Sequence, residues 1–174
     1  MKKNQIVLVV GLLAAGACAG TDGPVGGTIE ITAVDYAFNG VPGAVQTGAE
    51  LTFTNESAAE VHEIIVMKIA DGEERTIDEL LALPEEESES LVEFQGLLVA
   101  LPGEAGVNPE GPGTSITLSE AGRYALVCFI PQGADPAVVE AAMAEGGGGE
   151  GPPDMGDGTP HAFLGMATEF QVEG

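Results

Sequence analysis

The sequence contains no tryptophan, two histidines and two cysteines among its 174 residues. It is also poor in positive charge, because 5 basic side chains stand against 28 acidic ones, for a formal net charge of −23 at pH 7. Nucleic acids and anionic membrane surfaces are poor partners for such a surface, whereas a basic protein is favoured by complementary charge. General solubility, for instance in a salty habitat, explains the same charge balance equally well.

The apolar run near the N-terminus is too short to cross a membrane. It covers residues 6–17, which is 12 residues, and a membrane-spanning helix needs roughly 20. Lys2 and Lys3 precede this run, and small residues follow it. A positive start, a short apolar centre and a small-residue end are typical of export signals. We therefore expect residues 1–18 to be a signal peptide and the protein to be exported.

The end of this signal resembles the lipobox of bacterial lipoproteins. Ala15-Gly16-Ala17 stands immediately before Cys18, although such boxes usually carry a larger aliphatic residue where Ala15 stands. The resemblance implies lipidation of Cys18, and the alternative is an ordinary cleavage site. Residues 19–27, rich in glycine, would then form a flexible tether. We expect a periplasmic or cell-surface lipoprotein that contacts the membrane only through this anchor.

The chain from residue 28 to residue 174 has the pattern of an all-β domain. Short alternating or apolar runs are separated by glycine and proline turns, with no regular alternation of strands and helices. This predicts one domain built as a Greek-key, two-sheet β-sandwich. The expected strands are residues 28–34, 50–55, 61–69, 94–101, 114–118, 124–129 and 167–172.

Two short helices are expected to interrupt the strands. Residues 76–83 open with Thr76 and Glu79 in the spacing of a capping box, and residues 135–145 open with a potential cap, Asp135, followed by a proline. The acidic run 84–89 is expected to be a solvated connection. Residues 146–160, rich in glycine, proline and acids, are expected to form a mobile surface loop within an insertion spanning residues 130–159.

Both histidines occupy positions that suit a metal site. His62 opens one expected strand, Cys128 ends another, and His161 and Met166 flank the segment that leads into the last strand. Each has an ordinary explanation when taken alone: a core histidine, a loop histidine, a small buried thiol and a gap-filling thioether. Together, two imidazoles, a thiolate and a thioether form the mixed ligand set of blue-copper electron-transfer sites.

With these residues the chain resembles the cupredoxin family, the small blue-copper proteins that include plastocyanin and azurin. The resemblance covers residues 28–174 and is carried by Leu51-Thr52-Phe53-Thr54-Asn55 before His62, by Gly122-x-Tyr124-x3-Cys128, and by His161-x4-Met166. It implies one type 1 copper, with His62, Cys128 and His161 as the trigonal ligands. Met166 would be the long axial ligand.

The sequence departs from the family pattern in two respects. In plastocyanin and azurin a few residues separate the cysteine from the second histidine, whereas 32 residues intervene between Cys128 and His161. Met143 and Met155 lie in this insertion and could compete with Met166 as thioether donors. Glu63 also follows His62 where familiar members often have asparagine, so the hydrogen bonding around the cysteine sulfur is expected to differ.

The expected function is the transfer of single electrons between redox proteins, which could include a basic cytochrome, by a monomeric chain. The alternative is an exported copper carrier or sensor that uses the same ligands for copper delivery or sequestration. An enzymatic role is not expected, because multicopper oxidases and copper nitrite reductases need further histidines and this chain has none beyond His62 and His161. No nucleophile motif such as Gly-x-Ser-x-Gly accompanies them.

Overall fold

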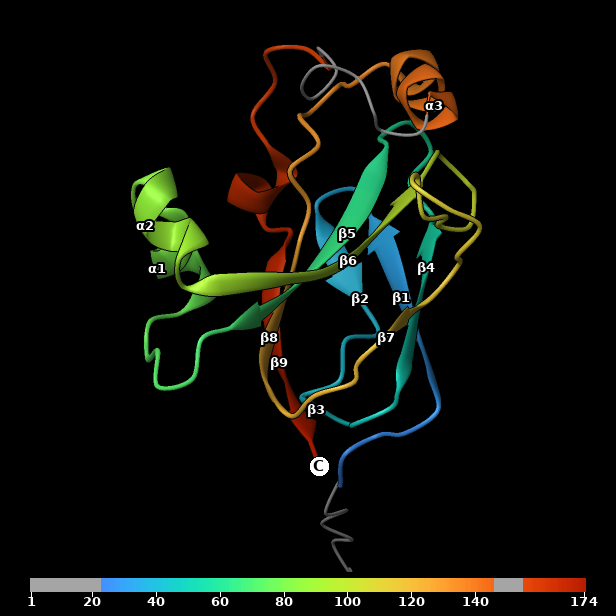
Figure 1. The fold of residues 1–174 in the computed structure, drawn as a ribbon. Helices are drawn as coiled ribbons and strands as arrows, with labels where there is room; N and C mark the ends of the chain where they lie inside the picture. Colours follow the sequence, from blue (N-terminus) through green and yellow to red (C-terminus); the bar gives the residue numbers. More distant parts are fainter. Residues whose placement is uncertain (1–22, 146–154) are drawn as a thin grey trace, which may run out of the picture.

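The computed structural model describes residues 23–145 and 155–174, which form two β-sheets with short helices outside them (Figure 1). The first sheet has the strand order β2 (Ala37–Asn39), β1 (Thr28–Val34), β4 (Glu50–Asn55) and β7 (Ile116–Thr117). The second has the order β3 (Ala44–Gln46), β9 (Ala167–Glu173), β8 (Gly122–Val127), β5 (His62–Ile69) and β6 (Val92–Ala100). The expected signal peptide, including Cys18, lies outside the described residues.

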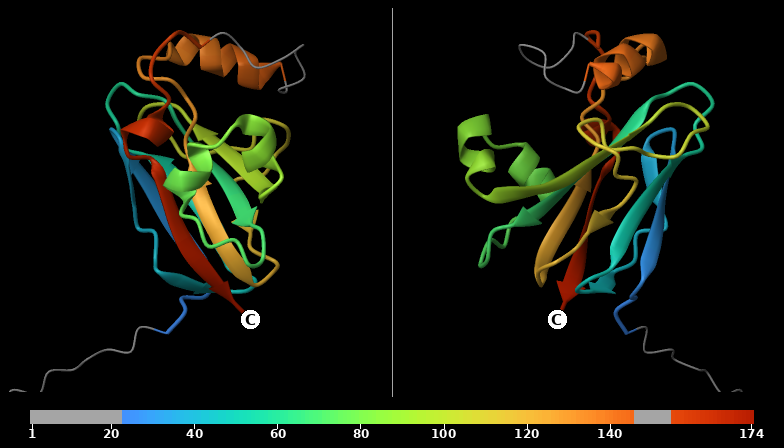
Figure 2. Two further views of the ribbon diagram at one scale, coloured as in Figure 1. Left: turned by 90° about the vertical axis from the view of Figure 1, so that its left-hand side faces the viewer. Right: turned by 45° about the vertical axis from the view of Figure 1, so that its right-hand side comes forward.

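The two sheets pack face to face, and the turned views of Figure 2 show them as two layers. Both sheets are mixed, because β1 pairs with β4 in parallel and β3 pairs with β9 in parallel, while the other strand pairs are antiparallel. One cluster of buried apolar side chains, drawn from both sheets, fills the space between them. The expected all-β, two-sheet sandwich is therefore confirmed.

Strand β8 shows how the sequence pattern aims the cysteine inward. Successive side chains of a strand point to opposite faces of the sheet. Tyr124 and Leu126 accordingly belong to the core between the sheets, and Cys128, directly after the strand, continues on that side. Ala125 and Val127 belong to a second apolar cluster on the outer face of the sheet. The predicted alignment of Tyr124, Leu126 and Cys128 on one face is confirmed.

The second cluster exists because one short helix packs apolar side chains on the outer face. Helix α1 (Ile77–Leu81) contributes Ile77 and Leu80, and helix α2 (Glu85–Glu89) follows it with no buried side chain. The expected capping box is present, since the Glu79 carboxylate accepts a hydrogen bond from the Thr76 N–H and the Thr76 hydroxyl accepts one from the Glu79 N–H. A third helix, α3 (Pro136–Ala144), begins after Asp135, which caps it as expected.

Three details differ from the sequence expectation. The acidic run expected as a simple connection forms α2, because Pro84 starts a turn that the Glu87 and Ser88 N–H groups close onto its carbonyl. Strands β2 and β3 were not expected, since three residues are too few to show an alternating pattern. The strand expected at residues 114–118 shortens to β7, whose pairing with β4 covers only two residues. No helix in the described part of the chain is long and apolar enough to cross a membrane.

Gly106 marks a close approach between β4 and the loop that follows β6. Its N–H donates to the Phe53 carbonyl at 2.8 Å, and a Cβ added there would lie 2.8 Å from Phe53 Cδ1 and 2.9 Å from Phe53 Cβ. We expect Gly106→Ala to lower the free energy of unfolding by about 1–3 kcal/mol through overpacking, as measured by urea denaturation. Gly111→Ala is the control, because nothing lies within 4 Å of its added Cβ. Equal stability of the two variants would contradict this packing.

Candidate metal centre

Three neighbouring strands bring the predicted ligands to one end of the second sheet. His62 is the first residue of β5, Cys128 directly follows β8, and His161 opens the 3₁₀ helix η1 (His161–Leu164) that leads into β9. Strand β8 lies between β5 and β9 and is antiparallel to both. The start of β5, the end of β8 and the start of β9 therefore meet at the same end of the sheet.

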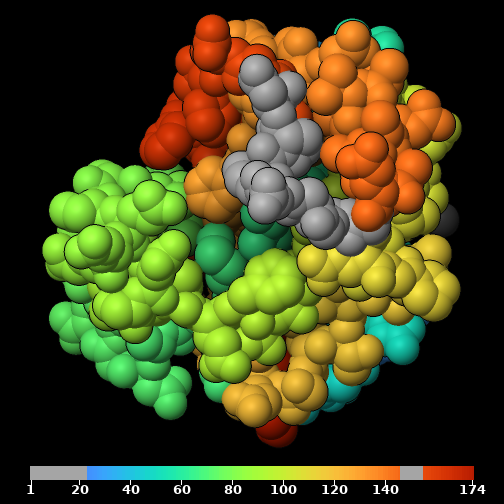
Figure 3. Space-filling view, turned by 45° about the horizontal axis from the view of Figure 1, so that its top comes forward, coloured from blue at the N-terminus to red at the C-terminus, as the bar shows by residue number. Residues whose placement is uncertain are grey.

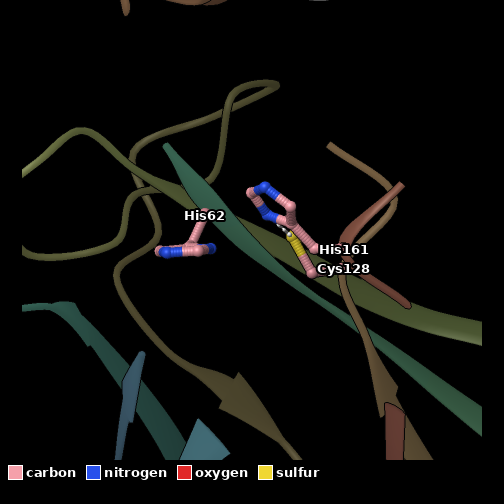
Figure 4. Close-up of side chains that lie close together, drawn as sticks. All are labelled: His62, Cys128 and His161. Atoms are coloured by element: carbon pink, nitrogen blue, oxygen red, sulfur yellow. Dashed lines mark hydrogen bonds between the residues drawn. The ribbon is translucent and has the colours of Figure 1, made fainter. Parts of the chain in front are cut away.

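The three side chains lie close together at this end of the sheet, with the His161 ring beside the Cys128 sulfur (Figure 4). One ligand atom from each of His62, Cys128 and His161 lies within 4.8 Å of the others, and all three residues are buried. The Cys128 Sγ atom is 3.5 Å from His161 Nδ1 and accepts a hydrogen bond from the Glu63 N–H at 3.5 Å. Two nitrogens and one sulfur thus surround a space in which a metal ion could be bound.

After its long insertion the chain returns to this end of the sheet. A short ladder of backbone hydrogen bonds holds it there. The Gln132 N–H donates to the Thr159 carbonyl at 3.0 Å, and the His161 N–H donates to the Ile130 carbonyl at 3.0 Å. Closest to the site, the Ala162 N–H donates to the Cys128 carbonyl at 2.7 Å. The two ends of the insertion are therefore paired, and Cys128 and His161 are held as neighbours although 32 residues separate them.

Met166 is fully buried and belongs to the same core cluster as Cys128. Its carbonyl accepts a hydrogen bond from the Cys128 N–H at 3.1 Å, and its N–H donates to the His161 carbonyl at 3.0 Å. Met143 and Met155 are only partly buried, and with Glu63 they line a separate apolar cavity of about 140 Å³ beneath α3. Backbone contact to both Cys128 and His161 favours Met166 over these two as the axial ligand, which stays a prediction.

Three of the four imidazole nitrogens at this end of the sheet are buried without a hydrogen bond among the described residues. They are both ring nitrogens of His62 and the Nε2 atom of His161. Buried polar groups are almost always hydrogen-bonded, because an unpaired one costs about 1–3 kcal/mol. Ligation of a metal would satisfy one ring nitrogen of His62, while the Nδ1 atom of His161 is the nitrogen that faces Cys128 Sγ. The donor set of imidazole and thiol also matches the ligands that transition metals prefer, so the residues present fit a metal ion.

Burial sets the protonation of the three groups in the metal-free state. It lowers the pKa of His62 to about 4, helped by the nearby His161, and it also lowers the pKa of His161. The imidazoles are therefore neutral at pH 7, as metal ligands must be. Burial, with a smaller effect of Glu63, raises the pKa of the Cys128 thiol to about 12. A bound cation reverses this balance, because a coordinating thiol loses its proton.

A layer of polar groups that the sequence did not single out covers His161. The Glu60 Oε2 atom lies 3.4 Å from His161 Nε2 and accepts a hydrogen bond from the Gly133 N–H at 2.9 Å. Tyr36 packs its ring edge-on against the His161 ring, with centroids 5.2 Å apart, and its hydroxyl accepts a hydrogen bond from the Gln132 side chain at 2.7 Å. These contacts join distant segments, so no local motif could have revealed them.

Glu63 links the first histidine to the segment that follows the cysteine. Its carboxylate accepts a hydrogen bond from the Phe129 N–H at 2.9 Å, while its own N–H donates to Cys128 Sγ. Burial raises the pKa of Glu63 to about 7, although the Phe129 and Ile130 N–H groups act in the opposite direction. The hydrogen bonding at this position is therefore defined by the Glu63 carboxyl group, which joins β5 to the segment after Cys128.

No family model and no curated protein sequence matches the chain. Solved structures that align with it include reduced auracyanin from Roseiflexus castenholzii, at 20% identity and a TM-score of 0.45, over 86% of this chain and 99% of the auracyanin. Auracyanin A, a blue copper protein from Chloroflexus aurantiacus, aligns at 20% identity and a TM-score of 0.43, over 87% and 100% of the two chains. Auracyanin B aligns at 15% identity and 0.40, over 88% and 93%. These likenesses are distant, so the functional assignment rests on the site of this chain.

Proposed function

We propose that the chain is a cupredoxin that holds one type 1 copper and transfers single electrons between redox proteins. The observation that carries the proposal is the cluster of His62, Cys128 and His161, whose nitrogen and sulfur atoms converge, buried, at one end of a sheet. Two imidazoles and one thiolate in a trigonal arrangement, with a weak axial thioether, are the ligands of blue-copper sites. Met166 is the proposed axial ligand.

The surroundings of the site suit a one-electron carrier. Copper supplies the change between two oxidation states, and the residues around it need only hold their positions during that change. The ladder between the Cys128 and His161 segments and the three adjoining strands resist movement of the ligands. Cys128 would supply the thiolate that dominates electronic coupling to the copper, and the neutral rings of His62 and His161 would supply the two nitrogen ligands.

We do not propose an enzymatic activity. The chain has two histidines in all, and the proposed site uses both. A second copper centre of the kind found in multicopper oxidases would need further imidazole ligands. Four protein ligands also fill the coordination shell, so a substrate would find no open position, in contrast to catalytic metal sites.

The cellular setting of this carrier follows from the sequence alone. We propose export by the signal sequence of residues 1–18, cleavage before its last residue, lipidation at Cys18, and anchoring of a monomeric domain at the periplasmic or cell-surface side of a membrane. The strongly acidic composition supports a basic redox partner, because opposite charges accelerate encounter. Mass spectrometry of the mature protein tests the anchor: a lipid-modified Cys18 at the N-terminus is expected, and an unmodified residue there contradicts it.

Redox cycling separates an electron carrier from a copper carrier built on the same ligands. The copper-loaded protein should be oxidised and reduced repeatedly by a basic c-type cytochrome while it retains its metal. A copper carrier would instead lose copper to an apo-protein acceptor without redox turnover. Copper content and visible absorption, followed over ten cycles, distinguish the two outcomes, and loss of copper within the first cycles would contradict the electron-carrier function.

Glu60 offers a test of how the surroundings of His161 adjust the site. Its carboxylate, 3.4 Å from His161 Nε2, places negative charge beside the site and favours the more highly charged Cu(II). Removal of groups that contact metal ligands typically costs 10–100-fold in metal affinity. We expect Glu60→Gln to raise the reduction potential by about 59 mV, which corresponds to tenfold weaker preference for Cu(II). Voltammetry measures this, with the exposed Glu56→Gln as control; equal shifts in both variants would contradict the role.

A further inference from the structure

We propose that the protein exchanges electrons through an apolar groove beside α1 and α2, and that a basic redox protein docks there by inserting an apolar side chain. This inference rests on the proposed electron-transfer function and names the surface and the kind of partner. The groove, which we call the helical groove, is lined by Met67 of β5, Leu80 and Leu81 of α1, Val92 of β6, and the aromatic residues Phe129 and Phe163.

The helical groove has the size and composition of a recognition pocket. Its volume is about 400 Å³, within the range of about 300–1,000 Å³ usual for ligand pockets. Its lining is mostly apolar, with Glu85, Ser88 and Glu89 of the α2 segment as the polar members. Figure 3 shows a hollow in the surface. It lies between the green segment of α1 and α2 and the orange and red segments that contain Cys128 and His161.

Two aromatic residues connect this groove to the proposed copper site. Phe129 is bonded directly to Cys128 through the peptide backbone. Phe163 follows Ala162, whose N–H donates to the Cys128 carbonyl at 2.7 Å. Both rings are partly exposed, at 38% for Phe129 and 59% for Phe163. An electron thus has two routes from the cysteine to the groove, one wholly covalent and one across a single short hydrogen bond.

The alternative route through the second histidine is covered. The exposed fraction of His161 is 0%, and that of His62 is also 0%. Glu60 and Tyr36 lie against the His161 ring, and Gln132 is hydrogen-bonded to Tyr36. A partner therefore cannot contact an imidazole edge directly, whereas it can contact the two phenylalanine rings.

The rim of the groove determines the charge of the partner. The segment 77–89, which contains α1 and α2, carries no basic side chain and six acidic ones: Asp78, Glu79, Glu85, Glu86, Glu87 and Glu89. Arg75, just before it, is already paired with Glu73 at 2.7 Å and with Glu87 at 3.3 Å. An apolar centre with a polar rim is the usual arrangement of a docking site. Glu85 and Glu89 line the groove itself, and this acidic rim selects a partner with lysine or arginine side chains around an exposed apolar residue.

The electron balance of the docked reaction is simple. The Cu(I) protein gives up one electron and becomes the Cu(II) form, while the partner's one-electron centre, such as a ferric haem, is reduced by that electron. No proton or bond is transferred. The reverse reaction uses the same surface, so the groove serves both a donor and an acceptor of this class.

Phe163→Ser tests the apolar part of the surface. We expect the second-order rate of oxidation of the Cu(I) protein by a basic ferricytochrome c to fall about tenfold, as for the loss of a central interface anchor. Oxidation by ferricyanide should stay within twofold of wild type, because this small ion needs no docking groove and the covalent route through Phe129 is unchanged. Stopped-flow absorption measures both rates, and an unaltered blue spectrum shows that the copper site is intact.

A charge series tests the rim. The variant Glu85→Gln/Glu86→Gln/Glu89→Gln should react about tenfold more slowly with the cytochrome at low salt, with a weaker dependence on ionic strength. Its reaction with anionic ferricyanide should be unchanged or faster. The matched control is Glu50→Gln/Glu110→Gln/Glu173→Gln, which removes the same charge from exposed positions outside the helical groove. Equal slowing by the two triple variants would overturn the rim as a docking site.

The outcomes separate the docking surface from the function on which it rests. A wild-type Cu(I) protein that does not reduce ferricyanide contradicts electron transfer and the docking surface together. A wild type that reduces ferricyanide, with cytochrome rates unaffected by Phe163→Ser and by the rim variant, overturns the docking surface alone. Dimerisation of the wild type that Phe163→Ser abolishes, measured by light scattering, would assign the groove to a second copy and also overturn the proposal.

Discussion

Cys128→Ala is expected to abolish the intense visible absorption of the copper-loaded protein and its electron exchange with redox partners. The band arises from charge transfer between a thiolate and copper, and Cys128 supplies the sole thiol among the described residues. Its Sγ atom lies 3.5 Å from His161 Nδ1, within the proposed ligand set. The two histidines remain and can still hold a copper ion, but as a weakly coloured centre.

The matched control for this substitution is Met143→Leu. Met143 is also a sulfur-containing residue, but it is only partly buried and lines the separate cavity beneath α3. The control should keep the colour and one copper per chain. Absorption spectra and copper analysis of the two variants check this prediction. An intense band that survives in Cys128→Ala would show that another residue provides the ligand.

Asn55→Ala is expected to lower the free energy of unfolding by about 3 kcal/mol or more, since each abandoned buried partner costs about 1–3 kcal/mol. The Asn55 side chain is fully buried. Its amide nitrogen donates to the Glu60 carbonyl at 2.8 Å and to the Ala100 carbonyl at 3.1 Å, and its oxygen accepts from the Ser57 N–H at 2.9 Å. The substitution leaves all three backbone groups without these partners.

The same substitution should also loosen the metal site. Asn55 fixes the segment that leads to His62, and through it Glu60, which lies against His161. We therefore expect weaker copper binding in Asn55→Ala than in wild type. Urea unfolding of the metal-free protein measures the stability change separately from copper binding. The control Asn39→Ala, at an exposed position of β2, should stay within about 0.5 kcal/mol. A loss below 1 kcal/mol in Asn55→Ala would contradict this role.

The sequence contained most of what was needed to predict the sandwich. Alternation in the segment that became β8 correctly placed Tyr124, Leu126 and Cys128 on the inner face. The capping residues Thr76 and Asp135 correctly marked the starts of α1 and α3. These signals are local, because they depend on side-chain period and on hydrogen bonds within one helical turn. Strands of three residues, such as β2 and β3, carry no such period and were missed.

The ligand cluster was predicted from residue types, but its geometry could not be. Antiparallel pairing of β8 with β5 and β9 brings His62, Cys128 and His161 together, and strand order is a property of the whole sheet. The paired ends of the insertion, including the 2.7 Å hydrogen bond from Ala162 to Cys128, explain why its length does not separate the ligands. The entropy cost of closing a loop rises only slowly with its length, so the long insertion adds little to this cost.

The surroundings of the ligands were the least predictable part. Glu60 is two residues from His62 in sequence but acts on His161, and Tyr36 reaches the same ring from a turn between β1 and β2. The acidic run 84–89 reads as a solvated connection in sequence, yet as α2 it borders the helical groove. Such roles depend on which segments meet in space, and no residue pattern within one segment encodes them.

The electron paramagnetic resonance spectrum of the Cu(II)-loaded wild-type protein tests the central claim most directly. A thiolate that shares the unpaired electron with copper narrows the copper hyperfine splitting, so the spectrum reports the Cys128–copper bond itself. The type 1 site formed by His62, Cys128, His161 and Met166 predicts one copper per chain and this narrow splitting. The wide splitting of ordinary Cu(II), or a protein that binds no copper, would contradict it.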